Sequence, residues 1–441
     1  MKRLLSLLLC AVLALFCATT AQAAGVSITL TASEYALHYA FDTGAQDPFV
    51  ILEYATPAEK GWMMLYSADG HFEGDVSLAY SGAGGKTSVA LTSARTTGSI
   101  GKASTTLPKA ADYQKPTGKS NAKVTDFVLT ETPEGFHYAF NAAGTDYMLL
   151  YWRSKEQTVT QPVYPDENGH YEGDIISELT FARTQFTVQV KSGSGSMKKE
   201  ATVRKGYQAP EAPQRQEGRL SGVTVCIDAG HQENGRFVNE PIGPGLSGST
   251  SGKGGMAQGT KTNRRESIVC LEIGMLLRDE LLRQGANVVM TREDQTMFHT
   301  NIERCEIAEA GGAQIMLRLH CNNSSNRSKR GIQVYGPLNS DYAKAVADAD
   351  TYREMGQRLL DAMKTRVGMT LANSTGMVRL NDNYVGNNWA KMMCFLVEMG
   401  YLSNPAEEYL LVTPVYQQWL AEGMADGVYE IAVARGWVQA Q

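Results

Sequence analysis

The segment 223–231 reads VTVCIDAGH, an apolar run that ends in Asp228, a turn-forming Gly230 and a histidine. A short apolar run bounded by turn residues is typical of a strand that is buried on both faces. The segment 266–284, which follows later in the chain, spreads leucine and isoleucine at helical spacing over one broad face. A buried strand that leads to an amphipathic helix predicts an α/β layer with a largely parallel sheet.

The same alternation continues to the end of the chain. Further strands are expected at 287–291, 314–319, 331–335 and 393–397, and further helices at 301–310, 341–367 and 414–435. We therefore predict that residues 220–441 form one α/β domain, in which helices flank a mostly parallel central sheet.

Three of the predicted strands lead into residues that can bind a metal or transfer a proton. They lead to His231, His320 and Glu398, and Glu266 begins the long helix after the first strand. Because ligands bind at the carboxyl ends of parallel strands, these four side chains are expected to converge on one crevice. Two histidines, a glutamate and a second carboxylate are the composition of a catalytic zinc site. The spacing alone also fits unrelated polar residues at strand ends.

Several strings in this region, taken in order, match one known family. They are VCIDAGH (225–231), Glu266 at the start of a helix, VVMTR (288–292), ERCEIA (303–308), LRLHCN (317–322) and LVEMGYLSN (396–404). From about residue 222 to 435, the chain resembles the zinc-dependent N-acetylmuramoyl-L-alanine amidases of the Amidase_3 type.

The resemblance implies roles for four residues and a substrate. His231, Glu266 and His320 would bind one Zn2+ per catalytic domain, and Glu398 would be the catalytic carboxylate. The substrate would be peptidoglycan, cleaved by zinc-activated water at the amide between N-acetylmuramic acid and the L-alanine of the stem peptide. Glu272 is a rival ligand on the same helix, but it lies about 240° around the helix from Glu266, so both cannot face one metal.

The chain departs from the family pattern at several places. The segment 232–265 is longer than in compact members and rich in Gly, Ser and Thr, so it resembles a variant with an extended loop before the ligand glutamate. This loop either rims the site as a lid or is loose decoration. Arg318 contacts either substrate or a structural carboxylate. Asp228 either supports a metal ligand or stabilises its loop, and Cys270 is expected to be a buried filler.

The first half of the chain contains an internal repeat with an offset of 99 residues, as from His38 to His137. LHYAFD (37–42) matches FHYAFN (136–141), and DGHFEGD (69–75) matches NGHYEGD (168–174). Period-2 patterns and frequent turn residues predict two tandem β-sandwich modules, at 25–118 and 119–210, followed by a Pro-rich linker at 208–219. The repeated H-x-E-x-D pattern puts three polar side chains on one strand face, which fits a metal or sugar site but is interpreted here as a solvated hairpin.

The N-terminus has the pattern of a secretory signal peptide. Lys2 and Arg3 precede an apolar run at 4–18, and Ala21-Gln22-Ala23 fits a cleavage site, so residues 1–23 are predicted to be removed. No later apolar stretch has spanning length, so no stable membrane insertion is expected after cleavage. The mature protein is therefore expected to be secreted, or extracytoplasmic in the cell envelope, with aromatic residues of the repeats available for contact with the wall.

Cysteine content and charge exclude other classes. Two of the seven cysteines lie in the predicted signal peptide, and the remaining five sit in apolar strings without the spacing of a disulfide framework. The net charge of −5 argues against a protein whose task is to hold nucleic acid.

Two functions from different classes are consistent with the sequence. The first is a secreted peptidoglycan hydrolase, and the alternative is a non-catalytic wall-binding or regulatory protein on an amidase fold. The presence of all four candidate site residues favours the hydrolase. The chain has no H-E-x-x-H motif, which removes the commonest class of zinc peptidase.

Overall fold

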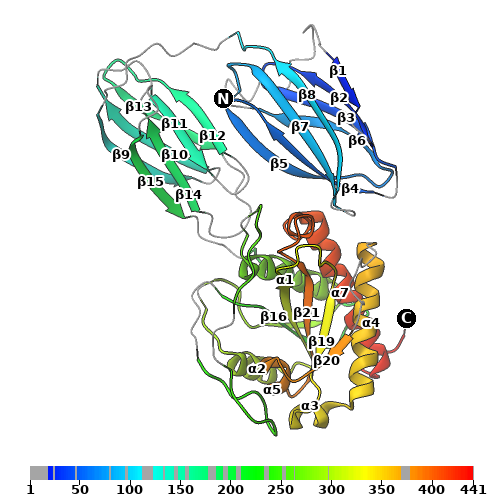
Figure 1. Cartoon of the computed structure of the whole chain (residues 1–441). Coiled ribbons are helices and arrows are strands. Elements are labelled where there is room, and N and C mark those ends of the chain that lie inside the picture. The colour runs from blue at the N-terminus through cyan, green and yellow to red at the C-terminus, as the bar shows by residue number, and fades with distance from the viewer. Residues whose placement is uncertain are drawn as a thin grey trace. The chain divides into compact units, whose positions relative to one another are not determined.

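The structure, a computed structural model, divides into two compact units (Figure 1). The first unit contains the described residues up to 204, and the second begins at residue 210. The structure describes residues 18–22, 25–44, 47–78, 81–94, 98–111, 123–132, 135–143, 148–153, 158–176, 185–191, 197–204, 210–232, 238–250, 255–262, 264–295, 297–368 and 378–440.

The first unit is built from antiparallel strands in three sheets. The four-stranded sheet has the order β1-β2-β3-β6 and the three-stranded sheet the order β13-β10-β9. The eight-stranded sheet has the order β15-β14-β11-β12-β5-β4-β7-β8. The bounds are β1 (Ala18–Gln22), β2 (Ser27–Ala32), β3 (Ala36–Asp42), β4 (Phe49–Ala55), β5 (Glu59–Tyr66), β6 (His71–Ser77), β7 (Gly85–Ser93), β8 (Ser99–Leu107), β9 (Val124–Thr132), β10 (Gly135–Ala142), β11 (Met148–Arg153), β12 (Thr158–Val163), β13 (His170–Ile176), β14 (Gln185–Lys191) and β15 (Met197–Arg204).

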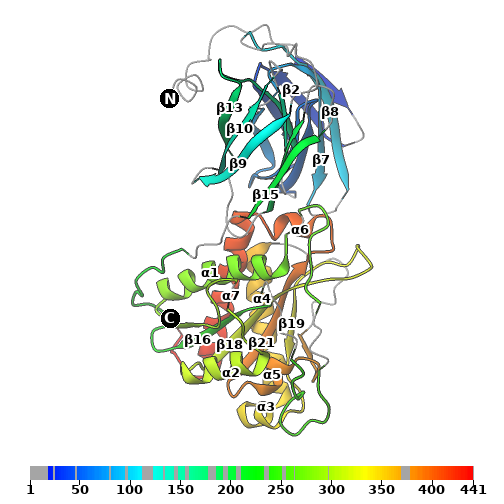
Figure 2. The ribbon, with the colours of Figure 1, turned by 90° about the vertical axis from the view of Figure 1, so that its left-hand side faces the viewer.

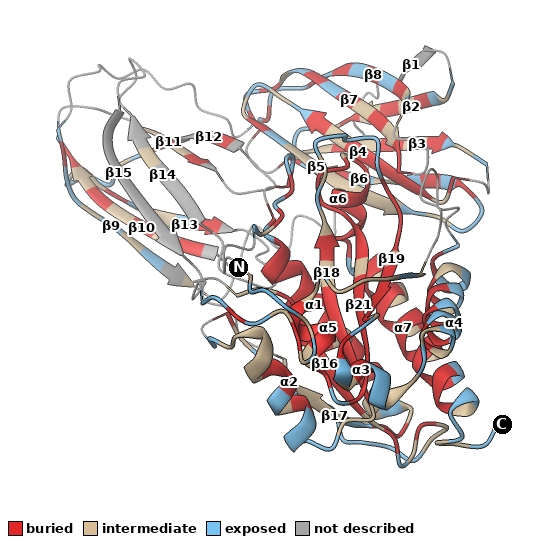
Figure 3. Ribbon diagram, turned by 60° about the horizontal axis from the view of Figure 1, so that its bottom comes forward, coloured by how far each residue is buried: buried red, intermediate tan, exposed pale blue. Residues whose placement is uncertain are grey.

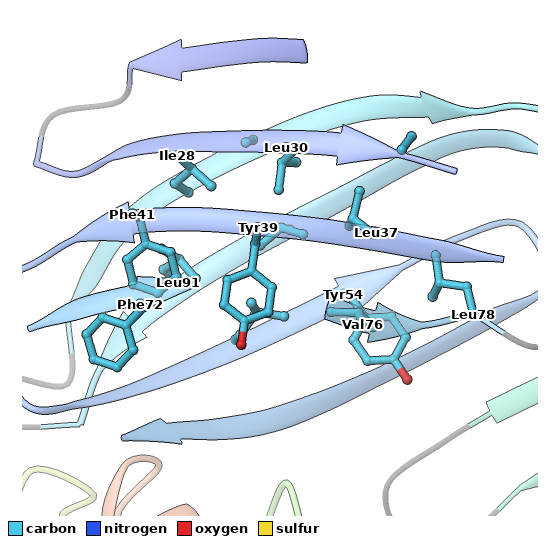
Figure 4. Packing of buried hydrophobic residues seen from close by; sticks show 14 of the residues in the cluster. Ile28, Leu30, Leu37, Tyr39, Phe41, Tyr54, Phe72, Val76, Leu78 and Leu91 are labelled. Atoms are coloured by element: carbon cyan, nitrogen blue, oxygen red, sulfur yellow. The ribbon is translucent and has the colours of Figure 1, made fainter. Parts of the chain in front are cut away.

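Each repeat has its own hydrophobic core. In the first repeat, alternate residues of β2, β3 and β6 face residues of β4, β7 and β8, as Figure 4 shows for Tyr39, Phe41 and Leu91. The rings of Phe41 and Phe72 stack with centroids 4.9 Å apart. In the second repeat, Phe140 and Tyr171 stack in the same way at 4.6 Å. The matching sequence strings thus supply matching core contacts.

One sheet runs through both repeats. β5 of the first repeat pairs with β12 of the second, where Lys60 lies opposite Thr158 and Glu59 opposite Val159. The sequence did not predict this pairing, because a contact of two residue pairs between edge strands leaves no pattern in either strand. β1 lies within the predicted signal peptide and pairs with β2, whereas residues 1–17 are outside the described part of the chain.

The second unit has a six-stranded mixed sheet of order β17-β16-β18-β21-β19-β20. Four of its described pairings are parallel, and β19 pairs with β21 antiparallel, so the predicted mostly parallel sheet is confirmed. The strand bounds are β16 (Thr224–Ala229), β17 (Asn287–Met290), β18 (Ile315–Asn322), β19 (Gln333–Gly336), β20 (Val378–Leu380) and β21 (Met393–Tyr401). The helix bounds are α1 (Glu266–Arg283), α2 (Asn301–Ala310), α3 (Asp341–Val346), α4 (Ala349–Val367), α5 (Val385–Trp389), α6 (Glu407–Leu410) and α7 (Pro414–Ala434).

Helices cover both faces of this sheet (Figures 1 and 2). On one face, Cys226, Met316 and Cys394 pack with residues of α2 and α5. On the other face, Gly274 of α1 lies against Ile227, and α7 packs between α1 and α4. Figure 3 accordingly shows β16, β18 and β21 as largely buried. A sheet covered on both faces explains why these strands are continuous apolar runs.

Two segments differ from the sequence-based expectation. The helix expected at 341–367 is interrupted, because Ala347 is extended and the Asp348 side chain caps α4 by accepting a hydrogen bond from the N–H of Thr351 (2.7 Å). The described part of the predicted linker is bound to the second unit: Arg278 donates to the carbonyl of Pro210 (3.0 Å) and Arg215 to that of Gly285 (2.9 Å). No helix in the described part of the chain is both long and apolar enough to cross a membrane.

Candidate metal and catalytic site

The four predicted site residues lie at one edge of the central sheet. His231 follows β16, His320 lies near the end of β18 and Glu398 near the end of β21. These strands are parallel neighbours, and His320 and Glu398 are paired in register. Glu266 is the first residue of α1. Parallel strands end at the same edge, which is why four residues far apart in sequence meet there.

Three of these residues form a group with metal-ligand geometry. The ligand atoms of His231, Glu266 and His320 all lie within 4.8 Å of one another. Oε1 of Glu266 is 3.1 Å from Nε2 of His231 and 3.0 Å from Nδ1 of His320. Two ligands of one tetrahedral zinc, each bound at about 2.0–2.1 Å, are about 3.3 Å apart. The donor set and its spacing therefore fit a zinc ion.

The Glu266 carboxylate is fixed by backbone groups as well as by the histidines. The N–H of Ala257 donates to Oε2 (2.8 Å), and the N–H of Cys321 donates to Oε1 (3.0 Å). Burial alone would raise the pKa of Glu266, but the contacts with His231 and His320 hold it well below its usual range. Glu266 is therefore an ionised carboxylate in a fixed orientation.

Glu398 lies in a different environment. Its Oε2 is buried and has no hydrogen-bond partner among the described residues, and the same holds for Nε2 of His320. Burial, and then the charge of Glu266, raise the pKa of Glu398 to about 8. Burial likewise lowers the pKa of His320, which favours its neutral form. A carboxyl group with a pKa near neutrality is suited to take up and release a proton.

Asp228 is the centre of a buried ion cluster behind the site. Its side chain accepts hydrogen bonds from Arg304, from Arg318 (2.8 Å) and from Thr291 (2.7 Å). Arg318 also donates to Oδ1 of Asn301 (2.6 Å). Of the open alternatives, the structure thus assigns Arg318 to a structural carboxylate and Asp228 to stabilisation of the strand ends.

Two buried arginines hold the loop that carries His231. Arg304 donates to the carbonyl of His231 (3.2 Å), and Arg292 donates to those of Gly230 (3.0 Å) and Ser267 (2.6 Å). His231 itself has a φ of 58°, a left-handed conformation that is uncommon for residues with a side chain. The two arginines therefore fix an unusual turn and tie it to the start of α1. The sequence contained both arginines in the family strings but gave no indication of these contacts.

The described parts of the insertion 232–265 are anchored to the domain. Glu240 is buried and accepts from the N–H of Ile302 (2.8 Å) and from the Asn301 side chain (2.7 Å), at the start of α2. Trp389 donates to the carbonyl of Pro241 (2.9 Å). Together with the contact from Ala257 to Glu266, these bonds show that described parts of the insertion are built into the domain and support the site.

The contacts of the remaining candidate residues show which of them lie at the site. Glu272 is bound to Arg264 (2.9 Å) and to Gln417 (3.0 Å), so it does not join the site. Cys270 is buried, as predicted. Sequence reasoning missed Gln333, which pairs in register with Glu398 on the neighbouring strand β19. No motif marks Gln333, because its place beside the site follows from an antiparallel pairing that the sequence does not reveal.

Comparison with known proteins finds a family model that matches the region of the site. The family model described as N-acetylmuramoyl-L-alanine amidase matches residues 225–430. Residues 225–430 are thus similar to N-acetylmuramoyl-L-alanine amidases. The matched region, called the amidase domain below, includes all four site residues.

The relatives share this domain at low identity. The chain is 27% identical over 209 residues to the uncharacterised protein YqiI of Bacillus subtilis, covering 47% of this chain and 84% of that protein. It is 27% identical over 218 residues to the probable cell wall amidase LytH of Staphylococcus aureus, covering 48% of this chain. The match spans 60% of the length of LytH.

Solved amidase structures align with the same half of the chain. The N-acetylmuramoyl-L-alanine amidase from Clostridium difficile 630 is 23% identical, with a TM-score of 0.39, and covers 49% of this chain and 100% of that structure. The apo amidase Ami1 from Mycobacterium abscessus is 21% identical, with a TM-score of 0.44, and covers 48% and 99% respectively.

Proposed function

We propose that the amidase domain hydrolyses the amide between the lactyl group of N-acetylmuramic acid and the L-alanine of peptidoglycan stem peptides. The observation that carries the proposal is the convergence of His231, Glu266, His320 and Glu398 at one sheet edge. The match to the N-acetylmuramoyl-L-alanine amidase family model supports the substrate class. His231, Glu266 and His320 would hold one zinc ion, and Glu398 would be the catalytic residue.

The mechanism assigns each carboxylate a separate task. A zinc ion held by the three ligands would lower the pKa of a coordinated water and polarise the amide carbonyl. Glu398 accepts a proton from the attacking water on its unpaired Oε2 and passes it to the alanine amine as the C–N bond breaks. Glu266, held by backbone N–H groups, keeps its orientation throughout.

The test compares two glutamate variants on soluble muropeptides. Glu398→Gln should keep its zinc and lose activity by about 10²–10⁴-fold, because the amide cannot accept the proton. Glu306→Gln, a change at an exposed glutamate of α2, is the matched control and should retain wild-type activity. If Glu398→Gln were as active as the control, Glu398 would not be the catalytic residue.

The remaining expectations about the whole protein are part of the same proposal. Residues 1–23 would be a signal peptide, and the mature protein would act outside the cytoplasm on the wall. The repeats 25–118 and 119–210 would be tandem β-sandwich modules that contact the wall, which is supported by a separate core in each repeat. Residues 220–441 would be the zinc-dependent catalytic domain.

A further inference from the structure

Strands β19 and β20 continue the sheet beyond β21, the strand that carries Glu398. Glu398 is opposite Gln333 of β19, and Tyr335 of β19 is opposite Arg379 of β20. Residues opposite each other in adjacent strands share a face of the sheet, as do alternate residues within one strand. Glu398, Gln333, Tyr335 and Arg379 therefore all lie on one face.

Helix α4 covers the other face of β19 and β20. Val378 lies against Gly356 of α4, and Val334 is fully buried. Because Arg379 follows Val378 in the strand, its side chain points away from α4. In agreement with this, Arg379 is exposed and Gln333 is half-buried. Both side chains are thus accessible to a ligand on the face that carries Glu398.

The neighbours of Gln333 fix the orientation of its amide group. Oδ1 of Asn322 accepts from the N–H of Asn323 (2.8 Å), so Nδ2 of Asn322 is the donor to Gln333 (3.2 Å). The atom of Gln333 that accepts this bond is therefore Oε1, which also accepts from the Tyr335 hydroxyl (2.5 Å). Nε2 of Gln333 makes no hydrogen bond within the described residues. It is left as a donor beside Glu398.

Arg379 is a cation without a counter-charge close to the same site. It forms no ion pair with a carboxylate of the described residues. Burial, and then the charge of Glu398, raise the pKa of Tyr335, and the charge of Arg379 opposes them, so Tyr335 lies near both charges. With about 4.8 Å between strands and about 3.3 Å per residue, the Cα atoms of Arg379 and Glu398 are about 12 Å apart.

This separation matches a group on the second residue of a peptide whose scissile amide lies at Glu398. Two extended residues span about 7 Å, and the long arginine side chain bridges the remainder. The second residue of a peptidoglycan stem is a D-glutamate joined through its side chain, so its α-carboxyl group is either free or amidated. A guanidinium without a partner suits a free carboxylate, which it can bind through two parallel hydrogen bonds.

We propose that Gln333 and Arg379 form the subsite for the peptide half of the substrate and make the enzyme selective for stems with a free carboxylate at the second residue. Gln333 donates from Nε2 to the carbonyl of L-alanine, and Arg379 binds the carboxylate. An amidated stem offers no charge to Arg379 and is bound more weakly. The inference rests on the proposed amidase function, because it takes the scissile amide to lie at Glu398.

The test compares two soluble muropeptides that differ only in this group, a carboxylate in one and an amide in the other. Wild-type mature chain should cleave the carboxylate substrate with the higher kcat/KM. Arg379→Gln should lower kcat/KM for the carboxylate substrate by about 10-fold or more, because it removes a charged hydrogen-bond partner. It should leave kcat/KM for the amide substrate unchanged. The matched control is Arg353→Gln, at an exposed arginine of α4, which should behave as wild type on both.

Binding of the product peptide gives a second readout that needs no turnover. Calorimetry should show that the carboxylate peptide with a free L-alanine amine binds wild type and the control equally. Its affinity should fall in Arg379→Gln and in Gln333→Met, a variant that removes the amide donor at similar size.

An unchanged ratio of kcat/KM for the two substrates in Arg379→Gln, or a wild type without preference for the carboxylate, would overturn the selectivity. Unchanged peptide affinity in both variants would overturn the subsite. If wild type cleaved neither substrate, the proposed amidase function would fail, and the peptide affinities alone would decide the subsite.

Discussion

Glu266 and Glu398 are two buried carboxylates of one site, and their surroundings shift their pKa values in opposite directions. Glu266 accepts hydrogen bonds from two backbone N–H groups and contacts both histidines, so it stays ionised. Glu398 has an unpaired buried oxygen and a pKa raised to about 8. Two carboxylates whose surroundings separate their pKa values are typical of acid–base sites.

At this scale, His320 is predicted to be required for metal binding. His320→Ala removes one of three ligands, so the zinc content of the amidase domain should fall together with its activity. The matched control is His299→Ala, a histidine outside the ligand group, which should keep both. Metal analysis of chains beginning at residue 210 measures the zinc of this domain alone. Unchanged zinc in His320→Ala would refute the ligand assignment.

At the scale of elements, the site depends on β16, β18 and α2 being held together through Asp228. Asp228→Ala should lower the free energy of unfolding by about 3–5 kcal/mol, because Arg304 and Arg318 would remain buried without their counter-charge. The control is Asp350→Ala, which removes the exposed partner of Arg353 and should cost less than about 1 kcal/mol. Urea unfolding measures the free energy of unfolding of both variants. An equal decrease in the two would contradict the account.

The contribution of Asp228 to the free energy of unfolding depends on pH with a defined sign. Burial alone would raise the pKa of Asp228, but Arg304 and Arg318 hold it well below its usual range. The contribution is therefore fully present above the unfolded-state pKa of about 3.9 and is lost only as pH falls through the folded pKa. The difference in unfolding free energy between wild type and Asp228→Ala should thus stay constant from about pH 7 to pH 5. A difference that shrinks in this window would contradict the assignment.

Sequence patterns predicted those parts of this domain that follow from hydrophobic periodicity and from the order of strands and helices along the chain. Buried strands that lead into His231, His320 and Glu398 indicated the site edge, because parallel strands end together. The contacts of Asp228 with Arg318 were not predictable, since they join side chains on two strands whose register the sequence does not specify. The break before α4 was missed because two extended residues, Ala347 and Asp348, interrupt an otherwise helical pattern.

At the scale of the whole molecule, the amidase domain and the repeats are separate compact units with separate proposed tasks. A chain beginning at residue 210 should fold and cleave soluble muropeptides at the wild-type rate, but bind intact sacculi more weakly. A chain beginning at residue 220 should be less stable, because it lacks the bonds to Pro210 and from Arg215. Sedimentation with sacculi and thermal unfolding measure these effects. Equal sacculus binding by full-length and truncated chains would leave the repeats without a role in wall contact.

The most direct test of the central claim is digestion of purified peptidoglycan by the mature protein, with and without a zinc chelator, followed by mass spectrometry of the products. The account predicts stem peptides that begin with a free L-alanine amine, released only in the absence of chelator. Products cut at another bond, or no products while the protein stays bound to the wall, would contradict it, and the second result would favour a non-catalytic wall-binding protein.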